Sequence, residues 1–352
     1  MCLNLVRLGP AANKTANGRH WLLALALGLG LGVVEPALNP PAANAVCFFW
    51  QACARQRGRA SNTRAGGKRT GRIIGGNNTS IPYVISPRNA WIREPGLEHP
   101  YTIIWNPVDG VNRYTVRIWR WTFERDQPDI ALWEATVDNP NQLPFPQQVP
   151  LELGSYYSIE VVTDTGFSSD LDAGYYESGF QLLFEEDYEI LRSQLTEVTP
   201  LQSADNAFTD RDSLESATLA RAGVFYLEEM YADALATLQP LTNSSTASDL
   251  VYTALGDTYS QTGLNQLAID AYTQALARAI AVNDVLSEAT IRVNLADFYA
   301  TLRLFYHTLQ QLQQARDAYN ILAEETEIAQ IDRRINIIVS RLSRQREEEA
   351  IP

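Results

Sequence analysis

The chain contains 352 residues, which is more than one ordinary hydrophobic core holds, so a single small domain is excluded and two domains with flanking segments are predicted. Apolar residues (45%) and charged residues (20%) occur in the proportions of an ordinary soluble protein. The formal net charge of −13 is unevenly distributed, because residues 46–90 carry eight bases and no acid, whereas residues 91–352 carry 17 bases and 40 acids. A short basic arm therefore precedes an acidic body.

Residues 1–45 have the pattern of an export signal. Three bases and no acid precede an apolar run at residues 21–34, and Ala43-Asn44-Ala45 provides the small residues of a cleavage site. The run is shorter than the roughly 20 residues that a membrane-spanning helix needs. We predict a signal peptide and a periplasmic, envelope or extracellular protein with no integral membrane segment after cleavage; an uncleaved anchor is the alternative.

Residues 46–80 are predicted to be a basic linker rich in Gly and Arg. From residue 54 to residue 78 the chain has few large apolar groups, so it cannot bury enough surface to offset the entropy of ordering. Cys47 and Cys53 could close a small disulfide loop in an oxidising compartment or remain two free thiols. An exported protein is not expected to meet nucleic acid, so the arm is either a plain linker or a contact for an anionic envelope polymer.

Residues 81–182 have the pattern of a β domain. Apolar residues alternate at 101–105 and again at 114–118, and the turn residues of segment 106–110 separate the two runs. This pattern predicts a strand, a turn and a second strand, and further strands are expected at 130–134 and 151–162. The region also holds five of the seven tryptophans, Trp91, Trp105, Trp119, Trp121 and Trp133.

Two motifs in this region resemble the fibronectin type III and related immunoglobulin-like domains. Trp105-Asn106-Pro107 followed by Tyr114-Thr115-Val116 is similar to the early strand pair of that family. Residues 151–157 are similar to the corner before a late strand, with Tyr157 in the place of the tyrosine corner. The resemblance implies an all-β sandwich over residues 81–182.

Trp119 and Trp121 are candidate ligand-binding residues. Because Tyr114, Val116 and Ile118 form the inward set, alternation places the two indoles on the other face of the strand, where they could stack on a sugar ring. The alternative is a local bulge that turns one of them inward, so that it packs in the core.

Residues 183–212 are predicted to contain a bridging helix and a connection. Phe184, Tyr188, Leu191, Leu195 and Val198 fall on one helical face, so the period changes here from two to 3.6. The polar segment at 199–212 is expected to connect this helix to the next domain.

Residues 213–323 contain a repeat. A small residue followed three positions later by an aromatic residue occurs twice, and the two occurrences lie 34 residues apart. A second set of positions repeats at the same spacing of 34 residues. The pattern predicts two packed helices in each unit, and the third unit follows after 40 residues. The aligned pairs are Ala222 with Gly256, Phe225 with Tyr259, Tyr231 with Asn265, Ala234 with Ala268, and Leu238 with Tyr272.

These units resemble tetratricopeptide repeats. Leu255-Gly256, Tyr259, Gly263 and Ala268 of the second unit fit the pattern of that family best. The resemblance implies about three stacked helical hairpins whose first helices line a concave groove for a protein or peptide. The groove residues implied are Leu219, Tyr226, Thr253, Asp257, Ser260, Val293, Asp297 and Ala300. Its carboxylates would favour a basic or neutral partner.

Residues 324–345 are predicted to form a capping helix, followed by an acidic tail at 346–352. Isoleucines and leucines recur there at spacings of three and four, which gives one apolar stripe. An array of stacked units needs such a closing element. The alternative is a helix for dimerisation or for a membrane surface.

The sequence thus predicts an all-β immunoglobulin-like sandwich followed by an all-α tetratricopeptide-like array, an arrangement that resembles exported repeat proteins of bacteria, of which a cyanobacterial type is one alternative. We expect no enzyme, because no nucleophile with a base, metal cluster or phosphate loop is found. No catalytic residue, metal or cofactor is therefore predicted. The expected function is a protein-binding adaptor or scaffold, and the alternative is an envelope glycan-binding protein using Trp119 and Trp121.

Overall fold

The computed structural model describes residues 75–93, 101–123, 128–138, 141–175, 178–198, 211–243 and 247–349, all within one compact unit. The predicted signal peptide, Cys47, Cys53 and most of the basic linker, with its expected contact for an anionic polymer, lie outside these residues. The last residues of the predicted acidic tail also lie outside them.

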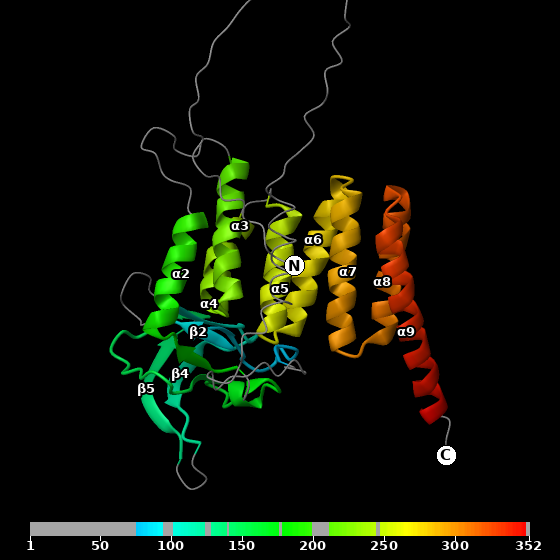
Figure 1. The fold of residues 1–352 in the computed structure, drawn as a ribbon. Coiled ribbons are helices and arrows are strands. Elements are labelled where there is room, and N and C mark those ends of the chain that lie inside the picture. Colours follow the sequence, from blue (N-terminus) through cyan, green and yellow to red (C-terminus); the bar gives the residue numbers. More distant parts are fainter. Residues whose placement is uncertain are drawn as a thin grey trace, which may run out of the picture. The chain divides into compact units, whose positions relative to one another are not determined.

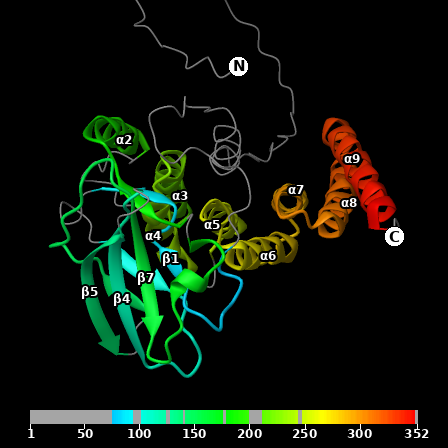
Figure 2. The same ribbon diagram turned by 90° about the horizontal axis from the view of Figure 1, so that it is seen from below.

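The first part of the described chain forms two small sheets (Figures 1 and 2). The three-stranded sheet is antiparallel and has the order β1-β3-β6, with β1 at Val84–Ser86, β3 at Thr102–Trp105 and β6 at Gln142–Pro144. The five-stranded sheet has the order β2-β8-β7-β4-β5, with β2 at Ala90–Ile92, β8 at Phe180–Leu182, β7 at Tyr157–Thr163, β4 at Arg113–Arg120 and β5 at Ile130–Asp138. A short 3₁₀ helix, η1, lies at Ser169–Leu171.

The predicted fold class, an all-β immunoglobulin-like sandwich before an all-α array, was wrong. Strand β2 pairs with β8 in parallel, Ala90 opposite Phe180, so the larger sheet is mixed, and the region from about residue 75 to 185 is a mixed α/β region. The prediction failed because alternation reports which face of a strand is buried but not which strand lies beside it. The strands missed, β1, β2, β6 and β8, have three residues each, too few to show a period.

The long strands nevertheless follow the expected alternation. In β4 the side chains of Tyr114, Val116 and Ile118 are buried, and the ring of Tyr114 lies edge-on to the buried ring of Trp105 at a centroid distance of 5.5 Å. The hydroxyl of Tyr157 accepts a hydrogen bond of 2.6 Å from the backbone N–H of Glu152. This local corner therefore forms in a sheet whose topology is not that of a sandwich.

Eight α-helices follow in the described part of the chain (Figure 1). Consecutive helices α3 and α4, α5 and α6, and α7 and α8 contact each other as hairpins, and α9 contacts α8. Their bounds are Glu185–Val198 (α2), Arg211–Leu227 (α3), Tyr231–Thr242 (α4), Asp249–Gln261 (α5), Asn265–Ala281 (α6), Val285–Thr301 (α7), Phe305–Leu322 (α8) and Glu325–Glu349 (α9).

The three hairpin turns share one backbone geometry. Gly263 has a φ of 74°, and the equivalent residues Glu229 and Arg303 have φ values of 62° and 60°. In each turn the following residue donates its N–H to the carbonyl five residues earlier, as Leu264 does to Tyr259. A non-glycine residue in this left-handed region costs about 1 kcal/mol or more, so the packing of the two helices, rather than the turn residue, fixes the hairpin.

Small residues set the distance between the helices of the second hairpin. A Cβ atom added to Gly256 would lie 2.8 Å from the ring of Tyr272 on the facing helix, which is closer than carbon atoms pack. Ala268 on α6 is fully buried in a cluster with Tyr272, Leu295 and Phe298. Neither position has room for a larger side chain.

We therefore expect Ala268→Leu to lower the free energy of unfolding by about 1 to 3 kcal/mol, because the added carbons must displace packed neighbours. Urea denaturation followed by circular dichroism measures this loss. Ala277→Leu, at an exposed position of the same helix, is the matched control and should change stability by about 0.5 kcal/mol or less. Equal stability of the two variants would contradict the packing argument.

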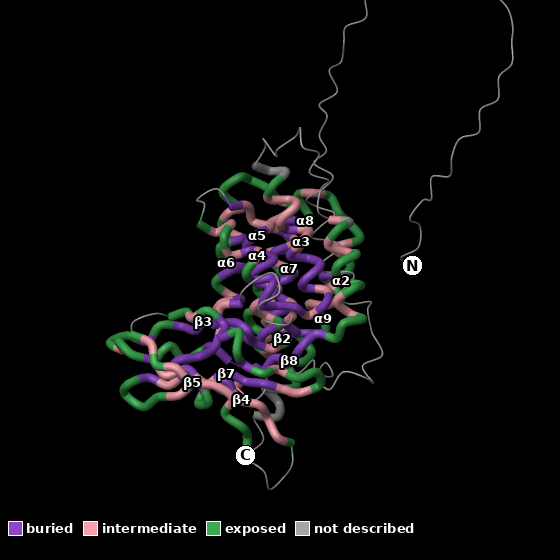
Figure 3. Tube along the Cα trace, turned by 90° about the vertical axis from the view of Figure 1, so that its left-hand side faces the viewer, coloured by how far each residue is buried: buried purple, intermediate pink, exposed green. Residues whose placement is uncertain are grey.

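The apolar stripe of α9 packs on the last hairpin. Ile331 and Ile338 are buried in a cluster with Ala289, Ala296 and Leu312, and Ile328, Ile335 and Leu342 pack around it. Figure 3 shows buried residues concentrated where the helices pack against one another. The helix continues to Glu349, into the segment expected to be a tail.

Backbone hydrogen bonds join the sheet region to two of the hairpin turns. The N–H of Gly75 donates to the carbonyl of Gly263 at 3.0 Å, and the N–H of Trp91 donates to the carbonyl of Glu229 at 3.1 Å. In addition, the side-chain amide of Asn89 donates from Nδ2 to the carbonyl of Gln261 at 2.8 Å. The strands are therefore held against the ends of α3 and α5, and this arrangement forms the walls of the site described next.

Candidate functional site

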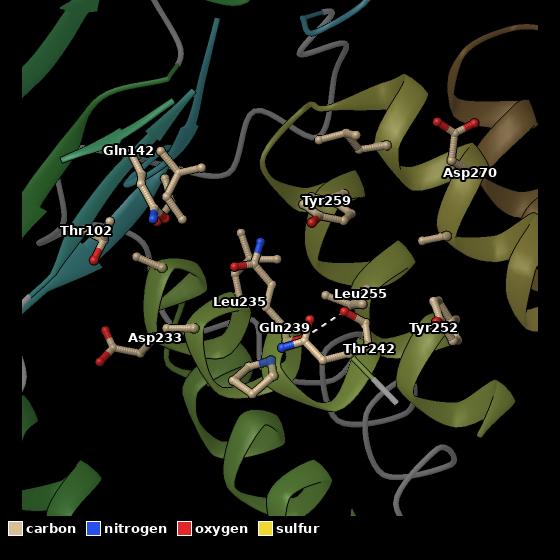
Figure 4. A pocket seen from close by; sticks show the side chains of 18 of the residues that line it. Thr102, Gln142, Asp233, Leu235, Gln239, Thr242, Tyr252, Leu255, Tyr259 and Asp270 are labelled. Atoms are coloured by element: carbon tan, nitrogen blue, oxygen red, sulfur yellow. Dashed lines mark hydrogen bonds between the residues drawn. The ribbon is translucent and has the colours of Figure 1, made fainter. Parts of the chain in front are cut away.

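A cavity of about 860 Å³ lies between the three-stranded sheet and helices α4, α5 and α6. Ser86, Thr102, Ile104 and Gln142 line it from the strands or their ends. Figure 4 shows Thr102 and Gln142 on the strand side, with Tyr252 and Asp270 across from them on α5 and α6. The remaining lining comes mainly from α4 and its C-terminal end, including Asp233, Leu235, Ala236, Gln239 and the following Asn243, and from α6, including Leu267 and Gln274.

A buried polar network holds one wall of the cavity. The carboxylate of Asp233 accepts a hydrogen bond of 2.8 Å from Arg93 Nη2 and another of 2.8 Å from the hydroxyl of Tyr101. Burial and then the nearby Asp233 carboxylate raise the pKa of Tyr101 well above its ordinary value, so the phenol keeps its proton and remains a donor. The charge of Asp233 is thus balanced within the chain, and its position is fixed.

The second carboxylate of the cavity has a different environment. Asp270 is exposed, and its Oδ1 accepts a hydrogen bond of 2.8 Å from the side-chain amide of Gln266, a neutral donor one turn earlier on α6. Exposed amides at Gln142 and Gln274 add donors and acceptors to the same lining. The cavity therefore combines hydroxyl and amide groups with one exposed carboxylate.

The predicted groove residues lie elsewhere, and none of the eight lines the cavity. Leu219, Tyr226 and Thr253 are buried. Asp257 accepts a hydrogen bond from the hydroxyl of Tyr272, and Asp297 pairs with Arg334 of α9. The remaining three, Ser260, Val293 and Ala300, are half-buried.

Reasoning from the sequence missed the cavity because its lining comes largely from the second helices of two hairpins and from strands. The available signal was a set of polar, at least partly exposed residues: Gln239 on α4, Asn243 directly after it, and Gln274 on α6. In the sequence alone, these residues have the pattern of an ordinary solvent-exposed helix face. Their role in the cavity becomes visible only in the structure, where the sheet lies opposite them. The hairpin pattern carries no information about that sheet.

Trp119 and Trp121 are both half-buried. A register shift between Ile118 and Trp119 marks a bulge where β4 pairs with β5. The indole N–H of Trp119 donates to Glu160 at 2.9 Å, and that of Trp121 donates to the hydroxyl of Ser158 at 2.7 Å. Trp121 also lies edge-on to Tyr156 at 5.0 Å, so both indoles have partners within the chain.

No group of three or more His, Cys, Asp or Glu residues suited to a metal ion occurs within the described residues. None of the described helices combines the length and apolarity that crossing a membrane requires.

Comparison with known proteins gives no relative from which a site could be transferred. No protein-family model, curated protein or solved structure matches the chain. The function is therefore inferred from the geometry of the chain itself.

Proposed function

We propose that this chain is a non-catalytic protein-binding adaptor, and that it holds a segment of its partner in the cavity between the three-stranded sheet and helices α4 to α6. The observation that carries the proposal is the cavity itself, about 860 Å³ with one strand wall and one helix wall. Its volume is within the range of about 300 to 1,000 Å³ in which ligand sites of proteins usually fall.

The chemistry of the lining favours an extended peptide segment. The N–H and C=O groups of an extended backbone have no partners of their own, whereas a helix satisfies its own groups. Amides such as Gln142 and Gln274 offer both donors and acceptors for such a backbone. Apolar residues between them, including Leu235 and Leu267, can receive small side chains.

A glycan is the second candidate, but the contacts favour it less. Sugar rings bind by stacking on open aromatic faces. The ring of Tyr252 has the guanidinium of Arg278 over it at 4.5 Å, and Tyr101 is buried. Trp121 is surrounded by Tyr156 at 5.0 Å and Tyr175 at 6.5 Å. We therefore place the ligand in the cavity and not on the tryptophans.

We further propose that the adaptor acts outside the cytoplasm, in the periplasm, the envelope or the extracellular space. Support for this location comes from the signal-like pattern of residues 1–45, which lies outside the described structure. A partner peptide would then be exported too.

We expect Ala236→Trp to weaken peptide capture strongly, because a bulky ring at this exposed lining position occupies part of the cavity without disturbing a buried residue. The full chain is used as bait for a library of displayed random nonapeptides, and enrichment is measured by sequencing. The wild type should enrich specific peptides, and Ala236→Trp should reduce their enrichment at least about tenfold, the equivalent of 1.4 kcal/mol of binding free energy.

Ala277→Trp, at an exposed position of α6 outside the lining, is the control for an added indole. It should enrich peptides as the wild type does. If Ala236→Trp retains the wild-type enrichment, the partner segment does not bind in the cavity.

A further inference from the structure

The helices that line the cavity are acidic. Helix α4 carries one acid, Asp233, and no base, and α5 carries Asp249 and Asp257 and no base. Helix α6 carries Asp270 and one base, Arg278. Of these acids, only Asp233 and Asp270 line the cavity, and Arg93 pairs with Asp233. The uncompensated negative charge that a ligand meets in the cavity is therefore that of Asp270.

The cations of this part of the chain are already engaged. Arg278 donates to the carbonyl of Ala247 at 2.8 Å and to the hydroxyl of Tyr252 at 3.1 Å. Arg93 pairs with Asp233 at 2.8 Å. No Lys, Arg or His is present in the described lining of the cavity, so its own residues do not neutralise the site as a whole.

Asp270 is the carboxylate left for a ligand. No Lys or Arg of the described residues forms an ion pair with it, and its hydrogen-bond donor, the Gln266 amide, is uncharged. It is exposed at the cavity, across from Thr102 and Gln142 (Figure 4). A charge in that position costs little in the free protein and gains a partner only when a cation arrives.

We propose that the partner segment held in the cavity is basic, with a Lys or Arg side chain that pairs with Asp270 while its extended backbone bonds to the surrounding amides. The proposal rests on the proposed function, because it names the chemistry of the segment bound at the same site. The carboxylate sets the preference among segments, and the amides supply binding that does not depend on side-chain charge.

The test is the same nonapeptide library, read for the charge of the enriched peptides. The wild-type chain should enrich peptides with a Lys or Arg over otherwise similar peptides with Gln, and over those with Glu still more. Asp270→Asn should weaken the preference for the base about threefold to fivefold, the size expected of a partly exposed ion pair. Asp270→Glu should restore most of it.

An acidic protein also attracts basic peptides without a specific site, so a variant of equal net charge is needed. Asp317→Asn removes an exposed acid of α8 outside the cavity and should keep the wild-type preference. Overturning results are an enriched set without a basic position, or a preference that Asp270→Asn and Asp317→Asn weaken equally. If the enriched peptides show no preference for a base but Ala236→Trp still blocks their binding, only the proposal of a basic segment is refuted. If Ala236→Trp has no effect on binding, the proposed function fails as well.

Discussion

Replacing Arg88 with Met should lower the free energy of unfolding by about 3 to 5 kcal/mol, the largest effect that we expect from any single substitution in the sheet region. The guanidinium is buried, with a side-chain exposure of 1%, and pairs with Asp172, exposed by 5%, at 2.9 Å. It also donates to the carbonyls of Thr262 at 2.9 Å and Val84 at 3.2 Å. Met keeps the length and apolar stem of the side chain, so the loss measures the charge and its hydrogen bonds.

The cost arises mainly from the groups that the guanidinium leaves behind. Without it, the Asp172 carboxylate remains buried with one backbone donor, Gly76, at 2.9 Å. The carbonyl of Thr262 also loses a partner. A buried charge without its counter-ion is far more costly than the pair is stabilising, so Arg88→Met combined with Asp172→Leu should be more stable than Arg88→Met alone.

Arg113 provides the matched control. It pairs with Asp138 at 2.7 Å, a shorter distance than in the buried pair, but the two side chains are exposed by 61% and 75%. Arg113→Met should therefore cost far less stability than Arg88→Met, since water solvates both charges when the pair is broken. Urea unfolding curves of both variants measure their free energies of unfolding. If Arg88→Met lowers the free energy of unfolding by less than about 1 kcal/mol, the structural role of the Arg88–Asp172 pair is contradicted.

The Arg88 pair also explains where prediction from the sequence reached its limit. Alternation correctly predicted that Tyr114, Val116 and Ile118 of β4 share a buried face. It could not place Asp172 or Thr262 beside Arg88, because these contacts join residues 84 and 174 positions apart. Such contacts depend on tertiary pairing, and the same gap in information led to the wrong sandwich topology.

The helical part illustrates the opposite case. The 34-residue spacing predicted that Glu229 and Gly263 are equivalent positions, and both have the same left-handed backbone in the structure. Glutamate seldom adopts that conformation. Local sequence preference at the turn is overruled by packing between the helices. The position of the candidate site was not predictable in this way, because the cavity forms only where Thr102 and Gln142 of the strands face α4 and α6.

Asp233→Ala should also cost about 3 to 5 kcal/mol, although the residue lines a cavity large enough for a ligand. The side chains of Arg93 and Asp233 are exposed by only 11% and 6%, and Tyr101 by 6%. Alanine would remove the acceptor of two donors at once and leave the guanidinium without its counter-ion. Thermal and urea unfolding of the full chain measure the loss.

Asp270→Ala tests whether the two carboxylates of the cavity have different roles. Asp270 is exposed and bonded to a neutral amide, so its removal should change stability by about 0.5 kcal/mol or less. Asp233 would then position α4 against Tyr101 and Arg93, whereas Asp270 would remain available to a ligand. If Asp233→Ala instead leaves stability within about 1 kcal/mol of the wild type, water entering from the cavity compensates Arg93 and Tyr101, and Asp233 would have to be counted, with Asp270, as a carboxylate open to the ligand.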